Sequence, residues 1–218
     1  MNNNDQSTLA LAGFLLQIKA IKLNPTKPFT WASGLKSPIY CDNRITLSYP
    51  KIRTHIRQEF VRLILEKYEK PDLIAGVATG GIAQGALVAQ ELGLPFAYVR
   101  SEKKSHGLTN LIEGVVEAGQ SVVVIEDLIS TGGSSLKAVE ALREKGAIVK
   151  GMMAIFTYGM QSSAVAFRSA ACELTTLTDF ETLLAKAIDE NYINEQEQAS
   201  LIEWKQDPKA WSDKHLNL

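Results

Sequence analysis

The 218-residue chain has little of several features that would assign it to a specialised class of protein. It has only two cysteines, Cys41 and Cys172, which lie far apart and match neither a metal-binding nor a redox-active spacing. This usage favours two inert thiols in a reducing cytosol, although one pairing of the two stays open. The formal net charge of −1 gives no reason to expect nucleic-acid binding. The sequence therefore predicts a cytoplasmic protein without a nucleic-acid partner.

The chain also lacks a long hydrophobic run. Its apolar N-terminal stretch, Leu9 to Ile21, is interrupted by Gly13, Gln17 and Lys19, and no basic region precedes it. Because the stretch is too short to cross a membrane, it is typical of an amphipathic helix and not of a signal peptide. The composition, 45% hydrophobic and 22% charged, is ordinary for a globular protein. We therefore expect no membrane partner.

From Asp72 onward, apolar runs of strand length alternate with apolar residues at helical spacing. The predicted strands are 72–78, 95–100, 121–127 and 147–157, and the predicted helices are 82–92 and 134–145. Such alternation is typical of right-handed βαβ units. The predicted fold class is therefore α/β, with a Rossmann-like, mainly parallel sheet flanked by helices.

Other elements are expected on both sides of this alternation. The sequence predicts a helix over 6–22, a hairpin over 29–50, a charged amphipathic helix over 51–70, and a helical region over 160–203 with one short strand near 172–176. The tail from Gln206 is expected to be a surface arm. The length predicts one domain over 1–218, made of an N-terminal helix and hairpin region (1–50), an α/β core (70–160) and a C-terminal helical part with its tail (160–218).

The most informative segment is SVVVIEDLISTGGSS, residues 121–135. It begins with a β-branched run, Val122 to Ile125, which is typical of a strand buried on both faces. Two acids, Glu126 and Asp127, follow, and then a turn of small residues leads into the next helix. A strand, a Gly/Ser/Thr loop and a helix start together form an anion-binding cradle, because unpaired main-chain N–H groups converge there.

The two acids beside this cradle cannot help to bind phosphate, so they must face something neutral or cationic, such as a sugar diol or a phosphate-bound metal. A ribose 5-phosphate satisfies both halves, with its phosphate on 130–134 and its hydroxyls on 126–127. The alternative is an ordinary βα turn, but such a turn has no need of paired acids. A P-loop is excluded by the residue order, and no Gly-x-Gly-x-x-Gly follows a predicted strand.

Unusual segments also follow two other predicted strands, at the sheet edge where open α/β sheets bind ligands. Ala-Thr-Gly-Gly-Ile, residues 78–82, has glycines that allow close backbone approach to a ligand. A helix capped by Thr79, with glycine for packing, is the equal alternative. Arg-Ser-Glu-Lys-Lys-Ser-His-Gly, residues 100–107, would alone indicate solvated surface. Its position instead favours a cationic loop that closes over a diphosphate.

These segments resemble those of a known enzyme family. Residues 121–135 resemble the phosphoribosyl-diphosphate motif of type I phosphoribosyltransferases. Arg-x3-Lys-x-His-Gly at 100–107 resembles the catalytic loop of orotate phosphoribosyltransferases, and Ser-Gly-x-Lys-Ser-Pro-x-Tyr at 33–40 is similar to the N-terminal segment of that family. The resemblance implies the type I phosphoribosyltransferase fold, with a small hood built from the N-terminal helix and hairpin.

The resemblance also implies an activity: Mg²⁺-dependent transfer of ribose 5-phosphate from phosphoribosyl diphosphate to orotate, in pyrimidine biosynthesis. It implies Mg²⁺ bound through the diphosphate, no metal site on the protein itself, and a homodimer whose catalytic loop is shared between subunits. Lys104 and His106 are the implied catalytic residues, Ser130 is the implied orotate contact, and Tyr40 would line the base pocket. The residues implied to bind phosphoribosyl diphosphate are Arg100, Lys104, His106, Glu126, Asp127, Leu128, Ile129, Ser130, Thr131, Gly132, Gly133 and Ser134.

The chain departs from the family pattern at three places. Ser101 and Ala32 stand where many members have lysine, and after the strand 147–157 no arginine occurs before Arg168. Arg44 is a candidate for the missing cation that would hold the orotate carboxylate. Two alternatives stay open: a phosphoribosyltransferase for a purine or uracil, and a non-catalytic regulator that senses phosphoribosyl diphosphate and binds nucleic acid.

Overall fold

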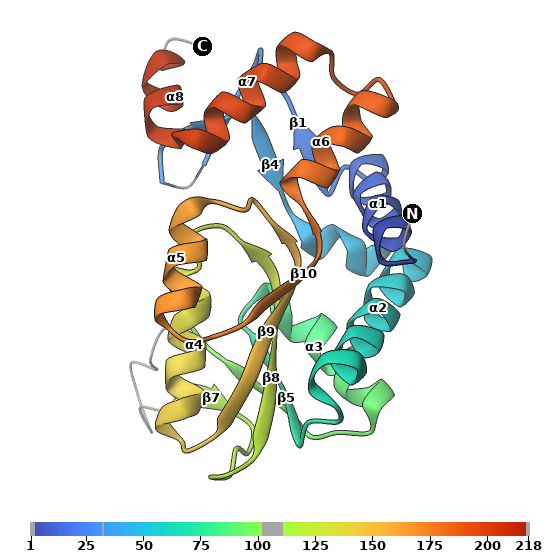
Figure 1. Ribbon diagram of the computed structural model, residues 1–218, viewed down its shortest axis with the longest axis vertical. Helices are drawn as coiled ribbons and strands as arrows, with labels where there is room; N and C mark the ends of the chain where they lie inside the picture. Colours follow the sequence, from blue (N-terminus) through green and yellow to red (C-terminus); the bar gives the residue numbers. More distant parts are fainter. Residues whose placement is uncertain (1–2, 32, 102–110, 217–218) are drawn as a thin grey trace. The chain divides into compact units, whose positions relative to one another are not determined.

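The computed structural model describes residues 3–31, 33–101 and 111–216 (Figure 1). The chain divides into two compact units, one formed by residues 1–46 and 178–218 and the other by residues 47–177. The first residues and the last residues of the chain therefore share one unit, although the sequence analysis assigned them to two separate parts, 1–50 and 160–218. That the whole chain acts as one domain stays a prediction.

The larger unit is built on a six-stranded sheet with the strand order β10-β9-β8-β5-β6-β7. The strands are β5 (Leu73–Val77), β6 (Phe96–Val99), β7 (Ile112–Glu113), β8 (Ser121–Ile129), β9 (Ile148–Thr157) and β10 (Leu174–Asp179). The pairs β5–β6, β5–β8 and β8–β9 are parallel, and β6–β7 is antiparallel. The predicted α/β fold with a mainly parallel sheet is confirmed.

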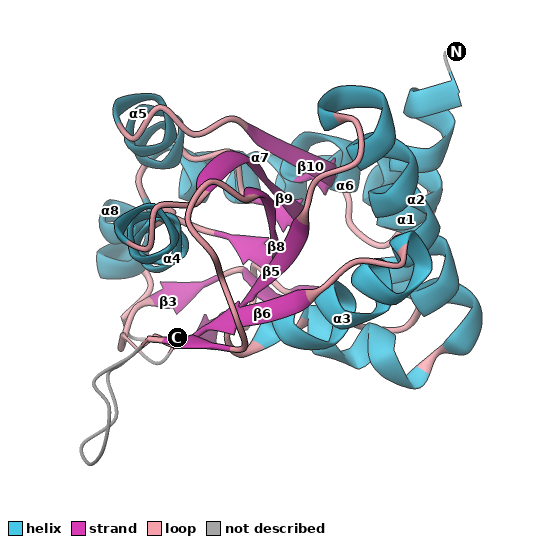
Figure 2. Cartoon of the chain, turned by 90° about the horizontal axis from the view of Figure 1, so that it is seen from below, coloured by secondary structure: helices cyan, strands magenta, loops and turns pink. Residues whose placement is uncertain are grey.

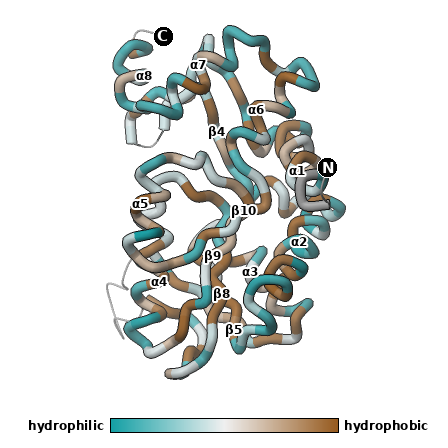
Figure 3. Tube along the Cα trace, in the orientation of Figure 1, coloured by the Kyte–Doolittle hydropathy of each residue, from teal (hydrophilic) through white to brown (hydrophobic). Residues whose placement is uncertain are grey.

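Helices cover both faces of this sheet. They are α2 (Pro50–Tyr68), α3 (Gly80–Leu92), α4 (Gly133–Glu144) and α5 (Gln161–Ser169). Helices α4 and α5 lie on one face, and α2 and α3 lie on the other (Figure 2). Because both faces are covered, the central strands are mainly apolar: every residue of β5 is buried, and the β8 trace is mainly hydrophobic apart from the acids Glu126 and Asp127 near its end (Figure 3).

The smaller unit combines helices with two short antiparallel strand pairs. Its elements are α1 (Asn3–Gln17), β1 (Ile21–Leu23), β2 (Phe29–Thr30), β3 (Lys36–Ser37), β4 (Ile39–Cys41), α6 (Phe180–Asp189), α7 (Glu195–Gln206) and α8 (Pro208–Lys214). Strand β1 pairs with β4, and β2 pairs with β3. The predicted turn of the hairpin is confirmed, with Gly34 at a φ of 86°. A 3₁₀ helix, Asn43–Ser48, continues from this unit into the larger one.

Three predictions for these regions were wrong. The helix predicted over 6–22 ends at Gln17, because Lys19 adopts a φ of 58° and Ile21 starts a strand. The hairpin predicted over 29–50 gives way to a 3₁₀ helix after Cys41. The predicted surface arm is helix α8: the Asp207 side chain accepts a hydrogen bond from the Ala210 N–H at its start, and Trp211 is buried.

Candidate functional site

A cleft of about 310 Å³ lies in the larger unit, where the carboxyl ends of the neighbouring parallel strands β5 and β8 meet. Two predicted segments, the loop after β5 and the motif at the end of β8, therefore come together. The cleft is lined by Ala78, Thr79, Gly80, Glu126, Asp127, Leu128, Ser130, Thr131, Gly132, Ser134 and Ser135. Of the predicted motif residues, Ile129 is buried in the core and Gly133 is not part of this lining.

One half of the cleft is a small-residue turn that leads into α4. Gly132, the residue before the helix, has a φ of 83°, and a Cβ at this position would lie 2.7 Å from Cε2 of Phe167. Glycine is therefore required there on two grounds. No side-chain hydrogen bond caps the start of α4, and unpaired N–H groups at a helix start can bind an anion. The small-residue turn predicted from the sequence is therefore present at the start of α4, and its binding of phosphate stays a prediction.

The other half of the cleft is acidic. Glu126 is 6% exposed, and both of its carboxyl oxygens accept hydrogen bonds. The Asp127 N–H donates to Oε1 at 2.9 Å, and the Ser135 hydroxyl donates to Oε2 at 2.9 Å. Burial, followed by the charge of the neighbouring Asp127, raises the pKa of Glu126 to about 8. Glu126 therefore holds its proton over much of the neutral range.

The loop after β5 leaves no room beside Asp127. A Cβ on Gly80 would lie 2.2 Å from Cγ of Asp127, and a Cβ on Gly81 would lie 2.3 Å from the Ile125 carbonyl oxygen. Thr79 precedes α3 without making a side-chain capping hydrogen bond, and the Ala78–Thr79 peptide bond is cis. The glycines are thus needed for close packing against the end of β8, as the alternative expected, but Thr79 makes no side-chain capping hydrogen bond.

Arg100 lies at the end of β6, where its N–H donates to the Leu111 carbonyl oxygen at 2.9 Å. Its guanidinium is 3.6 Å from Oε1 of Glu113, and both side chains are about one-third exposed. Lys104 and His106, the predicted catalytic residues, lie outside the described residues. Their roles therefore stay predictions.

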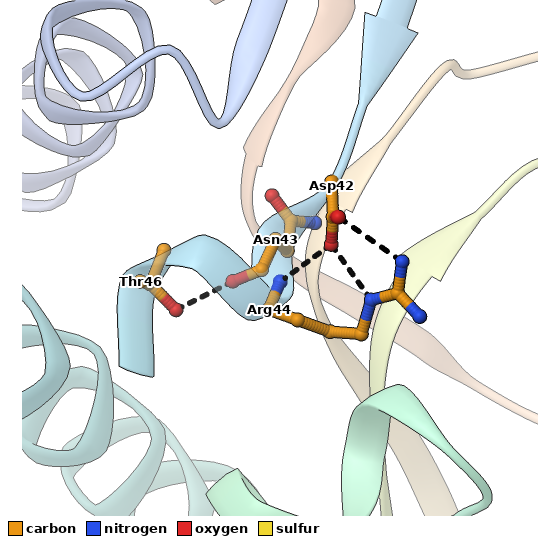
Figure 4. Close-up of polar contacts among 4 residues, drawn as sticks. All are labelled: Asp42, Asn43, Arg44 and Thr46. Carbon is orange, nitrogen blue, oxygen red and sulfur yellow. Dashed lines mark hydrogen bonds and ion pairs between the residues drawn. The ribbon is translucent and has the colours of Figure 1, made fainter. Parts of the chain in front are cut away.

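Arg44, the candidate cation for the orotate carboxylate, lies in the smaller unit and is already engaged (Figure 4). Its Nε and Nη2 donate to Oδ1 and Oδ2 of Asp42 at 2.7 Å and 3.0 Å. Hydrogen bonding from Arg44 holds the pKa of Asp42 below its usual value. Because the Arg44 side chain is 57% exposed, it can still be reached, but an anion would have to share it with Asp42.

Ser135 is the cleft residue that the sequence analysis did not assign to the site. It sits in the first turn of α4 between the phosphate turn and the buried Leu136, and its hydroxyl reaches back to Glu126. A polar residue beside the buried face at the start of a helix is a sequence signal for such a site residue, but it does not identify the hydrogen-bond partner.

Within the described ranges, no group of three His, Cys, Asp or Glu side chains is placed to hold a metal ion. Among all the residues that the structure describes, no helix is long and apolar enough to cross a membrane.

Comparison with known proteins agrees with this geometry. Residues 47–162 match the phosphoribosyl transferase domain family, so the fold and the cleft define a protein of that class. The chain is 60% identical to an orotate phosphoribosyltransferase of Phocaeicola vulgatus, over 90% of this chain and 93% of the relative. On this evidence, the chain belongs to the orotate phosphoribosyltransferase family.

Two solved structures have a similar fold. The orotate phosphoribosyltransferase of Aeropyrum pernix matches with a TM-score of 0.73 and 27% identity, over 84% of this chain and 99% of that chain. The UMP synthase of Leishmania donovani matches with a TM-score of 0.77 and 26% identity, over 92% of this chain but only 42% of that chain. The present chain therefore spans less than half of that longer protein.

Proposed function

We propose that this chain is an orotate phosphoribosyltransferase of pyrimidine biosynthesis. It transfers ribose 5-phosphate from phosphoribosyl diphosphate to N1 of orotate, and it forms orotidine 5′-monophosphate and pyrophosphate. The observation that carries the proposal is the cleft itself, in which two carboxyl groups and a helix-start cradle lie side by side. The 60% identity to a named orotate phosphoribosyltransferase supports orotate as the base.

In the proposed complex, the 5-phosphate is bound by the turn 130–134 and the first-turn N–H groups of α4. Glu126 and Asp127 accept hydrogen bonds from the ribose hydroxyls, and Ser130 contacts orotate. The reaction breaks the bond between the anomeric carbon and the diphosphate, so positive charge develops on the ribose and negative charge on the leaving group. The Asp127 carboxylate, and Glu126 once it has lost its proton, stabilise the first of these charges, because both side chains are held in place before the reaction.

The cationic loop, residues 100–107, binds the leaving group. We propose that Arg100, Lys104 and His106 contact the diphosphate, and that Lys104 is the catalytic lysine. Mg²⁺ prefers oxygen ligands, and the diphosphate supplies them, so the metal is proposed to bind through the substrate. When bound, it neutralises charge on the departing diphosphate. We further propose a homodimer in which the loop of one subunit completes the site of the other.

A cytoplasmic location is proposed on the cysteine usage. Neither Cys41 nor Cys172 forms a disulfide among the described residues, which is the usual state of cysteines in a reducing compartment.

The choice of base is tested by supplying orotate, hypoxanthine, adenine and uracil separately with phosphoribosyl diphosphate and Mg²⁺. The proposal expects pyrophosphate release with orotate alone, together with an equal amount of orotidine 5′-monophosphate. If phosphoribosyl diphosphate were consumed only with a purine or with uracil, that base and not orotate would be the substrate. No turnover with any base, combined with tight binding of phosphoribosyl diphosphate, would favour the regulator alternative.

The shared loop is tested by mixing two inactive variants, Lys104→Ala and Asp127→Asn. If the loop acts in trans, hybrid dimers contain one intact site, and an equal mixture recovers about one quarter of wild-type activity after subunit exchange. A mixture that stays inactive, despite exchange shown by native mass spectrometry, would contradict the shared site.

A further inference from the structure

We propose that Ser135 is a positioning residue for the transferase reaction: its buried hydroxyl aims the Glu126 carboxyl group at the ribose and keeps it available as a hydrogen-bond acceptor. The inference rests on the proposed function, because it gives Glu126 the task of binding the ribose hydroxyls. Ser135 itself does not need to touch the substrate. Its effect passes through Glu126.

The geometry around Glu126 supports this role. Ser135 is 2% exposed and Glu126 is 6% exposed, so water does not compete strongly for their hydrogen bond. The Ser135 hydroxyl lies 2.9 Å from Oε2, and the Asp127 N–H lies 2.9 Å from Oε1. Each carboxyl oxygen thus accepts one hydrogen bond, and the Asp127 side chain also hydrogen-bonds with the carboxyl group, which favours its protonated form. An oxygen has capacity for a second donor, and the cleft is where a ribose hydroxyl would supply it.

The position of Ser135 in the chain gives the contact a second consequence. Ser135 belongs to the first turn of α4, which follows the phosphate turn directly, whereas Glu126 belongs to β8. Their hydrogen bond ties the element that would hold the 5-phosphate to the acid that would hold the ribose. A substrate seated on the phosphate turn therefore meets a carboxyl group that is already oriented.

The neighbours of Glu126 explain why a single hydroxyl matters. Asp127 is the charged group that acts on it most strongly, and this charge favours the protonated form. From α3, Gly80 and Gly81 approach the end of β8, and they bring no charge. The β5 neighbour across from Ile125 is Gly76. On β9, Ala154 pairs with Glu126 and is apolar. On α4, Ser135 is the residue that contacts Glu126, and its hydrogen bond favours the ionised form.

The test compares Ser135→Ala with wild type across pH. A hydrogen bond to a charged group is about twice as strong as a neutral one. Its loss is expected to raise the midpoint of the acidic limb of kcat/KM by about one pH unit, and to lower kcat/KM at about pH 7.5 by about tenfold. The deficit should narrow as the pH rises above both midpoints. Ser135→Thr keeps the hydroxyl and should restore the wild-type midpoint.

Ser163→Ala is the matched control. Ser163 is also a buried serine in the first turn of a helix, and its hydroxyl donates to the Met160 carbonyl oxygen at 2.7 Å. Its replacement removes a similar hydrogen bond without touching Glu126. The control should lose stability but keep the wild-type pH profile. If the loss of any buried serine hydroxyl changed the pH profile, the control would change it as well.

A second readout does not depend on turnover. In protein labelled with ¹³C at the glutamate carboxyl carbons, the resonance that disappears in Glu126→Gln belongs to Glu126. Its titration midpoint should be higher in Ser135→Ala than in wild type. Equal midpoints in the two proteins would overturn the inference. A wild-type protein that is inactive with every base would overturn the proposed function instead, and the carboxyl titration would still decide whether Ser135 sets the state of Glu126.

Discussion

Replacing Glu126 by Gln is expected to stabilise the free protein at alkaline pH while it lowers activity. The amide imitates the protonated carboxyl group: its oxygen can accept from the Asp127 N–H, and its NH₂ can donate to the Ser135 hydroxyl oxygen. The variant therefore keeps the contacts of the neutral acid. It loses only the ability to become a buried carboxylate beside Asp127.

The magnitude follows from proton linkage. In the folded state the pKa of Glu126 is raised to about 8 from its ordinary value of 4.5, so the folded protein holds this proton where the unfolded chain has released it. Raising the pH between these values therefore favours unfolding. Each pKa unit corresponds to about 1.36 kcal/mol. Between about pH 5 and about pH 8, wild type should lose about 3 kcal/mol of unfolding free energy through this group.

The assay is urea unfolding of wild type and Glu126→Gln at about pH 5 and about pH 8. All other titrating groups are common to both proteins, so the difference between the two isolates Glu126. The advantage of the variant in unfolding free energy should be larger at the higher pH by about 3 kcal/mol. A difference that is the same at both pH values would refute the raised pKa, and with it the reasoning about the buried acid.

Two further substitutions test the glycines of the cleft. Gly80→Ala places a methyl group where a Cβ lies 2.2 Å from Cγ of Asp127, so this carboxylate must move. We expect kcat/KM to fall by about tenfold or more. Kinetics at the wild-type level would contradict the close contact. Gly132→Ala combines a φ of 83° with a clash against Phe167, and should lower the unfolding free energy by about 1–3 kcal/mol in urea titration. Gly133→Ala, whose Cβ would meet nothing within 4 Å, is the control and should change stability far less.

The core of the fold could be predicted because its sequence signals are local and repeated. The run Val122 to Ile125 is fully buried between covered faces, and a strand of this kind leaves a continuous apolar pattern. The turn after it could be predicted because a small-residue loop ahead of a helix has few other uses. The same reasoning placed the small-residue turn and the two acids beside each other, and both line the cleft.

The N-terminal and C-terminal boundaries depended on distant contacts. The apolar run that includes Ile21 fits a helix locally, but Ile21 pairs with Cys41 in a strand, and local pattern cannot show that partner. Helix α8 did carry a readable signal, since Asp207 followed by Pro208 is a typical helix start. The burial of Trp211 is a matter of tertiary packing and left no local pattern.

The contacts inside the site could not be read from the sequence for a similar reason. The approach of Gly80 to Asp127 depends on the register of two strands, in which Gly76 lies opposite Ile125. The hydrogen bond between Ser135 and Glu126 depends on how α4 returns onto β8. Both contacts arise only when the sheet is assembled, so the residue types were foreseen and their partners were not.

The most direct measurement of the central claim is a crystal structure of the protein with phosphoribosyl diphosphate and Mg²⁺ bound. The account predicts the 5-phosphate against the N–H groups of residues 131–134, the ribose hydroxyls against Glu126 and Asp127, and the diphosphate on the side of Arg100. A phosphoribosyl group bound with its phosphate elsewhere, or with its ribose away from the two acids, would contradict the assignment of this cleft.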